Sequence, residues 1–221
     1  MVEKDFSNSE LYEETYGYKT ERSTRRFLLI VLILFLCLLS LRLYVTCNYI
    51  CVIVDGPSMR NTLYHDDKLL MRRADGRKAK RGDVIVVDVR GYEEFASKDP
   101  EIPGKKFLIK RLIAVEGDKL YCQDGIIYIC YAGESEYVAL DEEYAYYLGD
   151  KTKYDFNDKE YIVGEGEIFF LGDNRQNSTD SRYQQQGGSK LDRLYKEEDI
   201  YGVVPQWAIE YQTILEWIFL R

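Results

Sequence analysis

The chain has 221 residues, enough for one substantial hydrophobic core with a smaller second lobe, and it is 46% hydrophobic and 31% charged, as globular proteins are. Its net charge is −8, and residues 134–167 carry eleven acids against three lysines, so we expect no nucleic-acid partner. A single histidine and five cysteines without a CxxC pair leave no multi-histidine or paired-cysteine zinc site, and we expect no metal.

The N-terminal part predicts a membrane anchor. Residues 1–26 are polar and form a cytoplasmic segment, whereas residues 27–45 are apolar and interrupted only by Arg42. A bilayer span needs about twenty apolar residues, which segment 27–45 supplies if Arg42 snorkels to the interface. Because no A-x-A cleavage pattern follows this segment, we expect a retained, single-pass anchor that contacts membrane lipid.

The charges around the anchor predict its orientation. Arg22, Arg25 and Arg26 precede the apolar run and favour a cytoplasmic N-terminus, although Arg42 and a later basic run weaken this asymmetry. We therefore predict a plasma-membrane protein whose residues 46–221 form an extracytoplasmic domain. The basic run itself reads as a solvated loop or as a surface for anionic lipid; its residues are Arg72, Arg73, Arg77, Lys78, Lys80 and Arg81.

After the anchor the pattern is that of a mostly β domain. Short apolar, β-branched runs separated by glycine-containing turns predict strands, at 49–54, 83–89, 107–115 and 167–171. The acidic, tyrosine-rich stretch of about 119–166 predicts an inserted lobe. If Asp124 and Gly125 form a tight hairpin turn, Cys122 faces Ile127 instead of Cys130, so the register predicts no disulfide.

The C-terminal segment predicts a helix. Its apolar residues recur at helical spacing, from Trp207 through Tyr211, Ile214 and Leu215 to Ile218. Two placements remain open, on the membrane surface or against the domain core.

Lys110 is the unusual residue of the predicted strand 107–115. A two-residue period places Leu108, Lys110, Leu112 and Ala114 on one face, so that one cation lies in an apolar row. Burial would lower the pKa of such a lysine and leave an amine able to accept a proton. From this segment alone, an exposed lysine on an edge strand is an equally serious alternative.

Two polar segments complete the candidate site. Ser58 follows Asp55-Gly56-Pro57 directly after an apolar strand, a sharp exit that can present the hydroxyl at the rim of a sheet. The loop 172–182 is dense in donors and acceptors that could orient a neutral lysine. His65, in a polar turn, fits an exposed loop histidine better than a catalytic base.

Together these segments resemble the bacterial type I signal peptidases, membrane-bound peptidases with a serine-lysine dyad (peptidase family S26). The resemblance covers most of residues 27–205 and runs in chain order through the anchor, Gly56-Pro57-Ser58-Met59 with Thr62-Leu63, Arg81 to Val86, Lys110 to Asp118, and Gly172 to Arg182.

The resemblance implies a membrane-bound serine endopeptidase that cleaves N-terminal signal peptides from exported preproteins after small residues, without metal or organic cofactor. It implies a β-rich catalytic domain with an inserted β lobe. By the same resemblance, Ser58 is the nucleophile and Lys110 its base. Ser178 would hold Lys110, and Asp180 with Arg182 would form a supporting ion pair. The remaining implied residues are Asp173 and Arg111 as structural support and Met59, Gly56 and Pro57 at the substrate site.

Two positions depart from the family's pattern. Asn61 stands where proline is common, and Gly56 stands where some members have a serine that helps to stabilise the oxyanion. A self-cleaving repressor peptidase of the same broad fold is disfavoured, because this chain has an anchor in place of a DNA-binding domain. A catalytically inactive β domain that only binds partners is disfavoured by the presence of both dyad side chains. A penicillin-binding-type acylase would need a Ser-x-x-Lys motif, which the sequence lacks.

Overall fold

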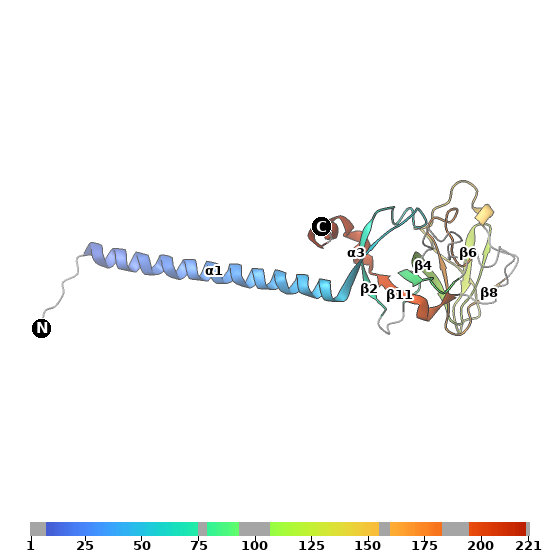
Figure 1. Ribbon diagram of the computed structural model, residues 1–221, viewed down its shortest axis with the longest axis horizontal. Coiled ribbons are helices and arrows are strands. Elements are labelled where there is room, and N and C mark those ends of the chain that lie inside the picture. Colours follow the sequence, from blue (N-terminus) through green and yellow to red (C-terminus); the bar gives the residue numbers. More distant parts are fainter. Residues whose placement is uncertain (1–7, 75–78, 93–106, 155–159, 183–194, 220–221) are drawn as a thin grey trace. The chain divides into compact units, whose positions relative to one another are not determined.

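The computed structural model describes residues 8–74, 79–92, 107–154, 160–182 and 195–219 (Figure 1). The chain divides by its internal contacts into two units, residues 1–48 and residues 49–221. Arg77 and Lys78 of the basic run lie outside the described residues.

The first unit is one long helix, α1 (Asn8–Asn48). Residues Arg22–Asn48 within it are long and apolar enough to cross a membrane, and the most apolar 18-residue window among them has a mean hydropathy of 2.8. Side chains from Arg22 to Tyr44 are exposed, which is the condition of an apolar helix that meets lipid on all sides. The helix therefore contains the predicted span 27–45 and also extends beyond it at both ends.

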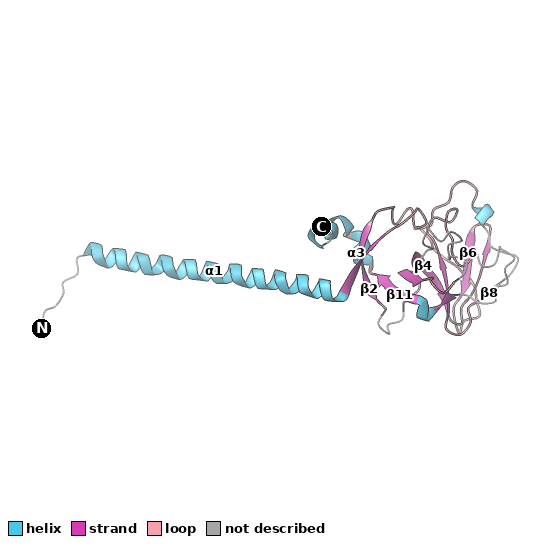
Figure 2. Ribbon diagram, in the orientation of Figure 1, coloured by secondary structure: helices cyan, strands magenta, loops and turns pink. Residues whose placement is uncertain are grey.

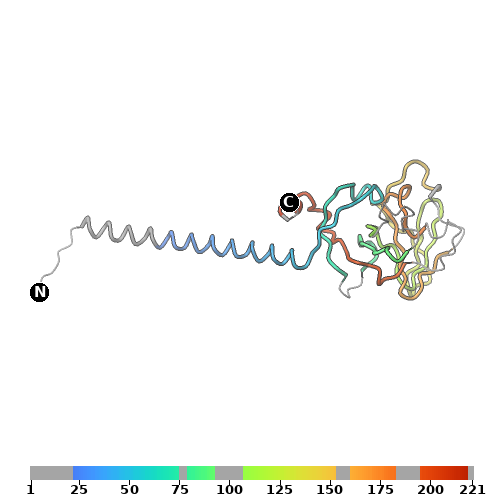
Figure 3. Tube along the Cα trace, in the orientation of Figure 1, coloured from blue at the N-terminus to red at the C-terminus, as the bar shows by residue number. Residues whose placement is uncertain are grey.

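The second unit is built on a seven-stranded antiparallel sheet in the order β1-β2-β11-β3-β4-β9-β10 (Figure 2). Its strands are β1 (Tyr49–Ile53), β2 (Lys68–Arg73), β3 (Val84–Asp88), β4 (Phe107–Val115), β9 (Glu167–Leu171), β10 (Tyr195–Lys196) and β11 (Ile200–Val204). The four strands predicted from sequence are confirmed as β1, β3, β4 and β9. The colours of Figure 3 show how the late strand β11 returns to lie beside the early strand β2.

Residues from the predicted inserted lobe form a second sheet, in the order β7-β6-β5-β8. Its strands are β5 (Lys119–Gln123), β6 (Ile126–Cys130), β7 (Val138–Ala139) and β8 (Tyr161–Ile162). Asp124 and Gly125 both have positive φ, 54° and 73°, as a tight hairpin turn requires. The resulting register pairs Cys122 with Ile127, as predicted, and no disulfide joins the buried side chains of Cys122 and Cys130.

One apolar cluster joins the two sheets. Phe169 and Leu171 of β9 and Ile113 of β4 pack with Leu120 and Ile127 of the lobe, all at most 2% exposed. Ala114 also belongs to this cluster, which corrects the predicted alternation along β4. A register shift between Leu112 and Ala114 turns Ala114 toward the face of Ile113.

Short helical segments complete the domain: the 3-10 helices η2 (Lys151–Tyr154) and η3 (Glu197–Asp199) and the α-helices α3 (Gln206–Glu210) and α4 (Gln212–Phe219). Both α3 and α4 contact β2. The C-terminal helical pattern is thus confirmed, with a break at Tyr211 that separates the two helices.

Candidate functional site

Ser58 and Lys110 meet at the centre of the site. Lys110 Nζ lies 2.8 Å from Ser58 Oγ and 2.9 Å from the carbonyl oxygen of Ile109. Lys110 is 3% exposed, whereas Ser58 is half-buried and remains accessible. A buried amine in hydrogen-bond contact with an accessible hydroxyl is the arrangement that base-assisted nucleophilic attack requires.

The burial of Lys110 follows from the position of its strand. β4 lies between β3 and β9 and is hydrogen-bonded on both sides, with Lys110 opposite Ile85. Lys110 and Arg111 are both buried, so the alternative of an exposed lysine on an edge strand is wrong for this chain. Burial among aliphatic side chains disfavours the ammonium form of a lysine.

The turn that carries Ser58 follows β1 directly and spans residues 54–62. It is called the nucleophile turn here, after the role predicted for Ser58. Gly56 has φ +88°, which a residue without Cβ adopts at no steric cost, and the carbonyl of Pro57 accepts the Arg60 amide at 3.0 Å. Asn61 has φ +93°. Because the proline ring fixes φ near −65°, proline cannot occupy this position in the present conformation. The turn at Asn61 therefore has a backbone conformation that the proline common in the family at this position could not adopt.

Asn174 holds the nucleophile turn in place from the loop 172–182. Its main-chain amide donates to the Ser58 carbonyl at 3.0 Å, and its Nδ2 donates to the Pro57 carbonyl at 2.9 Å. Asn174 is 2% exposed. This role of Asn174 was not predicted from the sequence, because one asparagine in a polar loop gives no sign of which carbonyl it will reach.

Gly172 marks the closest approach of the two segments. A Cβ at this position would lie 2.5 Å from the Ser58 carbonyl oxygen and 2.2 Å from Ser178 Oγ. The nucleophile turn and Ser178 therefore pack against the same main-chain atom, and only glycine allows this contact.

Ser178 lies in the expected place but does not make the expected hydrogen bond. Its Oγ is buried and makes no hydrogen bond to Lys110, so the predicted contact is not present. The Ser178 side chain packs against Gly172, and its hydroxyl contributes to the lowered pKa of the Asp180 carboxylate.

Arg111 and Asp173 form a buried ion pair under the site. The guanidinium donates through Nε to Oδ1 at 2.9 Å and through Nη2 to Oδ2 at 2.6 Å. Arg111 Nη1 also reaches the Gly82 carbonyl at 2.8 Å, and Thr62 Oγ1 donates to Asp173 Oδ2 at 2.5 Å. This network joins β4, the loop after β9 and the nucleophile turn.

Asp180 and Arg182 form a second buried pair, as the resemblance implies. Arg182 donates through Nε to Oδ1 and through Nη2 to Oδ2, each at 2.8 Å, and the Gly172 amide donates to Oδ2 at 3.0 Å. Burial by itself raises the pKa of Asp180, but the Arg182 guanidinium, the Gly172 amide and the Ser178 hydroxyl together outweigh it, and the pKa is lowered overall.

Arg175 ties this loop to the lobe. It forms a bidentate ion pair with Glu142, and its Nε donates to the Gly172 carbonyl at 3.1 Å. Burial opposes its charge, yet Glu142 holds the pKa of Arg175 above its ordinary value. This pair was not predicted, because Glu142 is one acid among many in the lobe.

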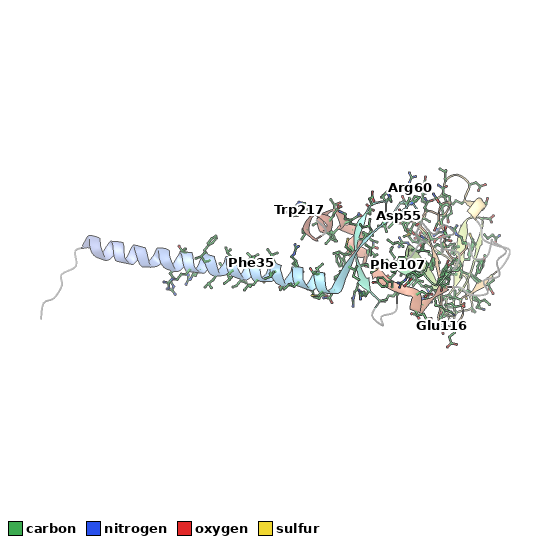
Figure 4. The ribbon with its side chains drawn as sticks, viewed as in Figure 1. Phe35, Asp55, Arg60, Phe107, Glu116 and Trp217 are labelled. Carbon is green, nitrogen blue, oxygen red and sulfur yellow. The ribbon has the colours of Figure 1, made fainter. Side chains whose placement is uncertain are left out.

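A cleft of about 610 Å³ opens onto Ser58 and Lys110. It is lined by Ser58 and Lys110 together with residues 50–55 around β1, Val86, residues 107–109 and Tyr201. Asp55 and Phe107 on its walls are labelled in Figure 4. Most of the other lining side chains are aliphatic, so the cleft suits an extended chain with apolar side chains.

The three residues predicted to bind substrate lie elsewhere. Met59 is fully buried at 0% exposure, because the helical turn that begins at this residue directs its side chain into the core. Gly56 and Pro57 line a separate hollow with Arg60 and His65. The His65 side chain is 60% exposed and its Nδ1 accepts the Gly56 amide at 3.2 Å, as expected of a loop histidine.

Comparison with known proteins identifies the family. Residues 24–210 match the family described as signal peptidase, peptidase S26. Signal peptidase I of Bacillus licheniformis is 33% identical over 59% of this chain, and the match covers 64% of that protein. Signal peptidase I P of Bacillus subtilis subsp. natto is 30% identical over 68% of this chain and 72% of its own length. A crystal structure of a signal peptidase I from Enterococcus faecalis is 23% identical, covers 58% of this chain and 98% of its own, and gives a TM-score of 0.38.

The family model spans most of the chain and includes the whole apolar stretch 27–45, the turn that carries Ser58, β4 and the loop 172–182. The chain therefore belongs to the signal peptidase family, peptidase S26.

Proposed function

We propose that this chain is a membrane-anchored serine endopeptidase that removes N-terminal signal peptides from exported preproteins with a Ser58–Lys110 dyad. The observation that carries the proposal is the 2.8 Å contact between Lys110 Nζ and Ser58 Oγ, made by a lysine that is 3% exposed. The names of its relatives support the class of substrate.

In the first half of the reaction, neutral Lys110 takes the proton of Ser58 Oγ as this oxygen attacks the scissile carbonyl. The tetrahedral intermediate collapses to an acyl-enzyme, and Lys110 returns its proton to the leaving amine. The Ser58 amide is the candidate donor to the oxyanion, since Gly56 offers no hydroxyl for that task.

In the second half, Lys110 takes a proton from water as the water oxygen attacks the acyl carbon. The bond from this carbon to Ser58 Oγ then breaks, and Lys110 gives the proton to Ser58 Oγ. One amine thus serves both halves as base and acid. Its burial supports this role. The amine of a lysine exposed to water is protonated at neutral pH, and an ammonium cannot accept a proton.

The cleft supports an extended peptide as substrate. β1 is the edge strand of the main sheet, and an edge strand offers main-chain groups to which a peptide can add as a further strand. The aliphatic lining of the cleft beside that strand would accept the small side chains before the cleaved bond. We propose that the domain is extracytoplasmic, where signal peptides emerge, with the N-terminus in the cytoplasm.

Substitution of the dyad tests the proposal. Ser58→Ala and Lys110→Ala should each abolish cleavage of a presecretory protein by the full-length chain in detergent, since removal of either member of such a unit costs on the order of 10⁴-fold or more. Ser135→Ala and Lys119→Ala, at exposed positions of the lobe, are the matched controls and should cleave at the wild-type rate. Normal turnover by either dyad variant would refute the mechanism.

A further inference from the structure

A second hollow lies beside the nucleophile turn and has no role in the chemistry described above. Its volume is about 490 Å³, and its lining residues are Gly56, Pro57, Arg60, Leu63, Tyr64 and His65. None of these residues lines the cleft that contains Ser58 and Lys110. Figure 4 labels Asp55 on the wall of the cleft and Arg60 on the wall of the hollow.

The hollow and the cleft are neighbours. Asp55 Oδ1, on the cleft wall, lies 3.5 Å from Nδ1 of His65, which lines the hollow. Along the chain, Gly56 and Pro57 of the hollow stand between Asp55 and Ser58, which both line the cleft. The nucleophile turn therefore forms the boundary between the two.

Cleavage at Ser58 requires space for the substrate on both sides of the cleaved bond. The cleft suits the signal-peptide side, because the edge strand β1 forms its wall and can pair with an extended peptide. The residues after the cleaved bond leave with the amine. An extended chain carries them away from the cleft and across the nucleophile turn, where the hollow can receive them.

Arg60 gives the hollow an unbalanced positive charge. Its side chain is exposed, and no carboxylate of a described residue forms an ion pair with it. The other basic side chain of the hollow, His65, has two carboxylates beside it, Asp55 at 3.5 Å and Asp66 at 3.6 Å. Arg60 is therefore the group that a negatively charged ligand would meet.

The guanidinium of Arg60 is oriented by an aromatic ring. Arg60 Cζ lies over the ring of Tyr146, 5.1 Å from its centroid. The main chain of Tyr146 is fixed to the loop 172–182, because its amide donates to the Asp173 carbonyl at 2.7 Å and its carbonyl accepts the Arg175 amide at 3.0 Å. A cation stacked on a fixed ring loses less freedom when it binds an anion.

The position of Arg60 indicates which part of the substrate it meets. Arg60 follows Ser58 by two residues, and with about 3.8 Å between consecutive Cα atoms their Cα atoms are at most about 7.6 Å apart. An extended peptide advances about 3.3 Å per residue. The second and third residues after the cleaved bond therefore lie at a matching distance from the nucleophile.

We propose that Arg60 is a specificity-determining residue that pairs with an acidic side chain at the second or third residue after the cleaved bond. This inference rests on the proposed function, since it concerns the other side of the same substrate. An exposed ion pair contributes modestly, so we expect Arg60 to select among preproteins without being essential for cleavage.

Exchange of charges tests the pairing. Three preproteins that differ only in carrying Glu, Gln or Lys at both positions are cleaved by the full-length chain in detergent. Wild type should cleave the Glu substrate with a kcat/KM at least about threefold above that of the Lys substrate, the size of one exposed ion pair. Arg60→Glu should reverse this order. In about 1 M salt, where the Debye length is about 3 Å, most of the preference should disappear.

Each comparison is a ratio within one variant, so a partly inactive preparation does not change it. Lys119→Glu alters the net charge by the same amount at an exposed position of the lobe, and it should keep the wild-type order. Arg60→Gln should cleave the three substrates alike, and it decides the question if Arg60→Glu does not fold.

The outcomes separate this inference from the proposed function. Equal kcat/KM for the three substrates in wild type, or a wild-type preference that persists in the Arg60 variants, overturns the role of Arg60 while the proposed function stands. If wild type cleaves none of the three substrates, the proposed function fails and this inference fails with it.

Tyr146 provides a second readout, as the residue that positions Arg60. Tyr146→Leu removes the ring but keeps the main-chain bonds to the loop 172–182, and it should reduce the preference for Glu over Lys. Tyr146→Phe keeps the ring and should retain the preference. An unchanged preference in Tyr146→Leu would overturn the part of the proposal that assigns the orientation of Arg60 to this ring.

Discussion

At the scale of single residues, the site depends on Gly172, a residue that has no reactive side chain. Gly172 contacts the Ser58 carbonyl and the Ser178 side chain at distances that leave no room for a methyl group. A methyl group forced into this space must move the nucleophile turn or Ser178, at a cost of about 1–3 kcal/mol.

Gly172→Ala should therefore lower kcat by at least about tenfold, because shifts of an ångström at a nucleophile are expensive. It should also lower the melting temperature. Gly91→Ala is the control, since its Cβ would meet no atom within 4 Å and should change neither quantity. The measurement is cleavage of a presecretory protein together with thermal unfolding in detergent.

Asn174 leads to a second prediction at this scale. Asn174→Ala removes the side-chain bond to the Pro57 carbonyl but keeps the main-chain bond to Ser58. We expect kcat to fall with little change in KM, and stability to fall by about 1 kcal/mol for one lost hydrogen bond. Asn177→Ala, at an exposed position of the same loop, should behave as wild type. An effect on KM alone would indicate that Asn174 contacts substrate instead of positioning Ser58.

The residues that the sequence revealed are those whose chemistry is unusual for their surroundings. Lys110 stood out because a cation interrupts an apolar row, and Ser58 because it follows a sharp exit from a strand. The roles of Met59 and Ser178 came from resemblance, and the structure gives them different contacts. Asn174 and Glu142 could not be found, because what distinguishes them is a partner more than thirty residues away in the chain.

At the scale of elements, the missed strands have a physical reason. β2 begins with Lys68 and ends with Arg72 and Arg73, so its apolar run is short, and β11 contains Gly202. Both strands form because their neighbours supply hydrogen bonds on each side, which a local pattern does not contain. β4, with nine mostly apolar residues, was predicted with the bounds that it has.

The loop 172–182 depends on buried ion pairs, and this makes its stability depend on pH. Asp180 has a pKa below its ordinary value of 3.8, because burial, which raises it, is outweighed by Arg182 together with the Gly172 amide and the Ser178 hydroxyl. A carboxylate with a lowered pKa stabilises the fold fully above its unfolded pKa, and this contribution is lost as the pH falls through the folded pKa.

Asp180→Asn should therefore destabilise the protein at pH 7 by about 3–5 kcal/mol, the cost of leaving a buried guanidinium unpaired. The difference from wild type should shrink below about pH 4, as Asp180 itself becomes neutral. Asp88→Asn is the matched control, since Asp88 pairs with Arg90 at the same two-residue spacing but Arg90 is 62% exposed. That pair should contribute far less, because water screens its exposed charges. Urea unfolding from pH 3 to 8 measures both, and a deficit that does not vary with pH would contradict the assignment.

At the scale of the whole molecule, the proposed function requires that α1 spans the bilayer. Arginine at the centre of a span costs about 2.5–3.5 kcal/mol, whereas near an end it can snorkel to the interface at much lower cost. The apolar stretch 27–45 has its centre at Leu36 and its end near Leu43.

Leu36→Arg should therefore reduce the share of the full-length chain that stays in membranes after alkaline carbonate extraction, while Leu43→Arg should leave it near the wild-type level. This depth dependence distinguishes a span from a helix that lies along the surface, on which two exposed positions of equal hydrophobicity would respond alike. The measurement is the membrane-bound fraction by immunoblot for the three chains. If both variants extract like wild type, or if the wild-type chain itself is released, α1 does not cross the bilayer and the cleft must meet its substrate without an anchor.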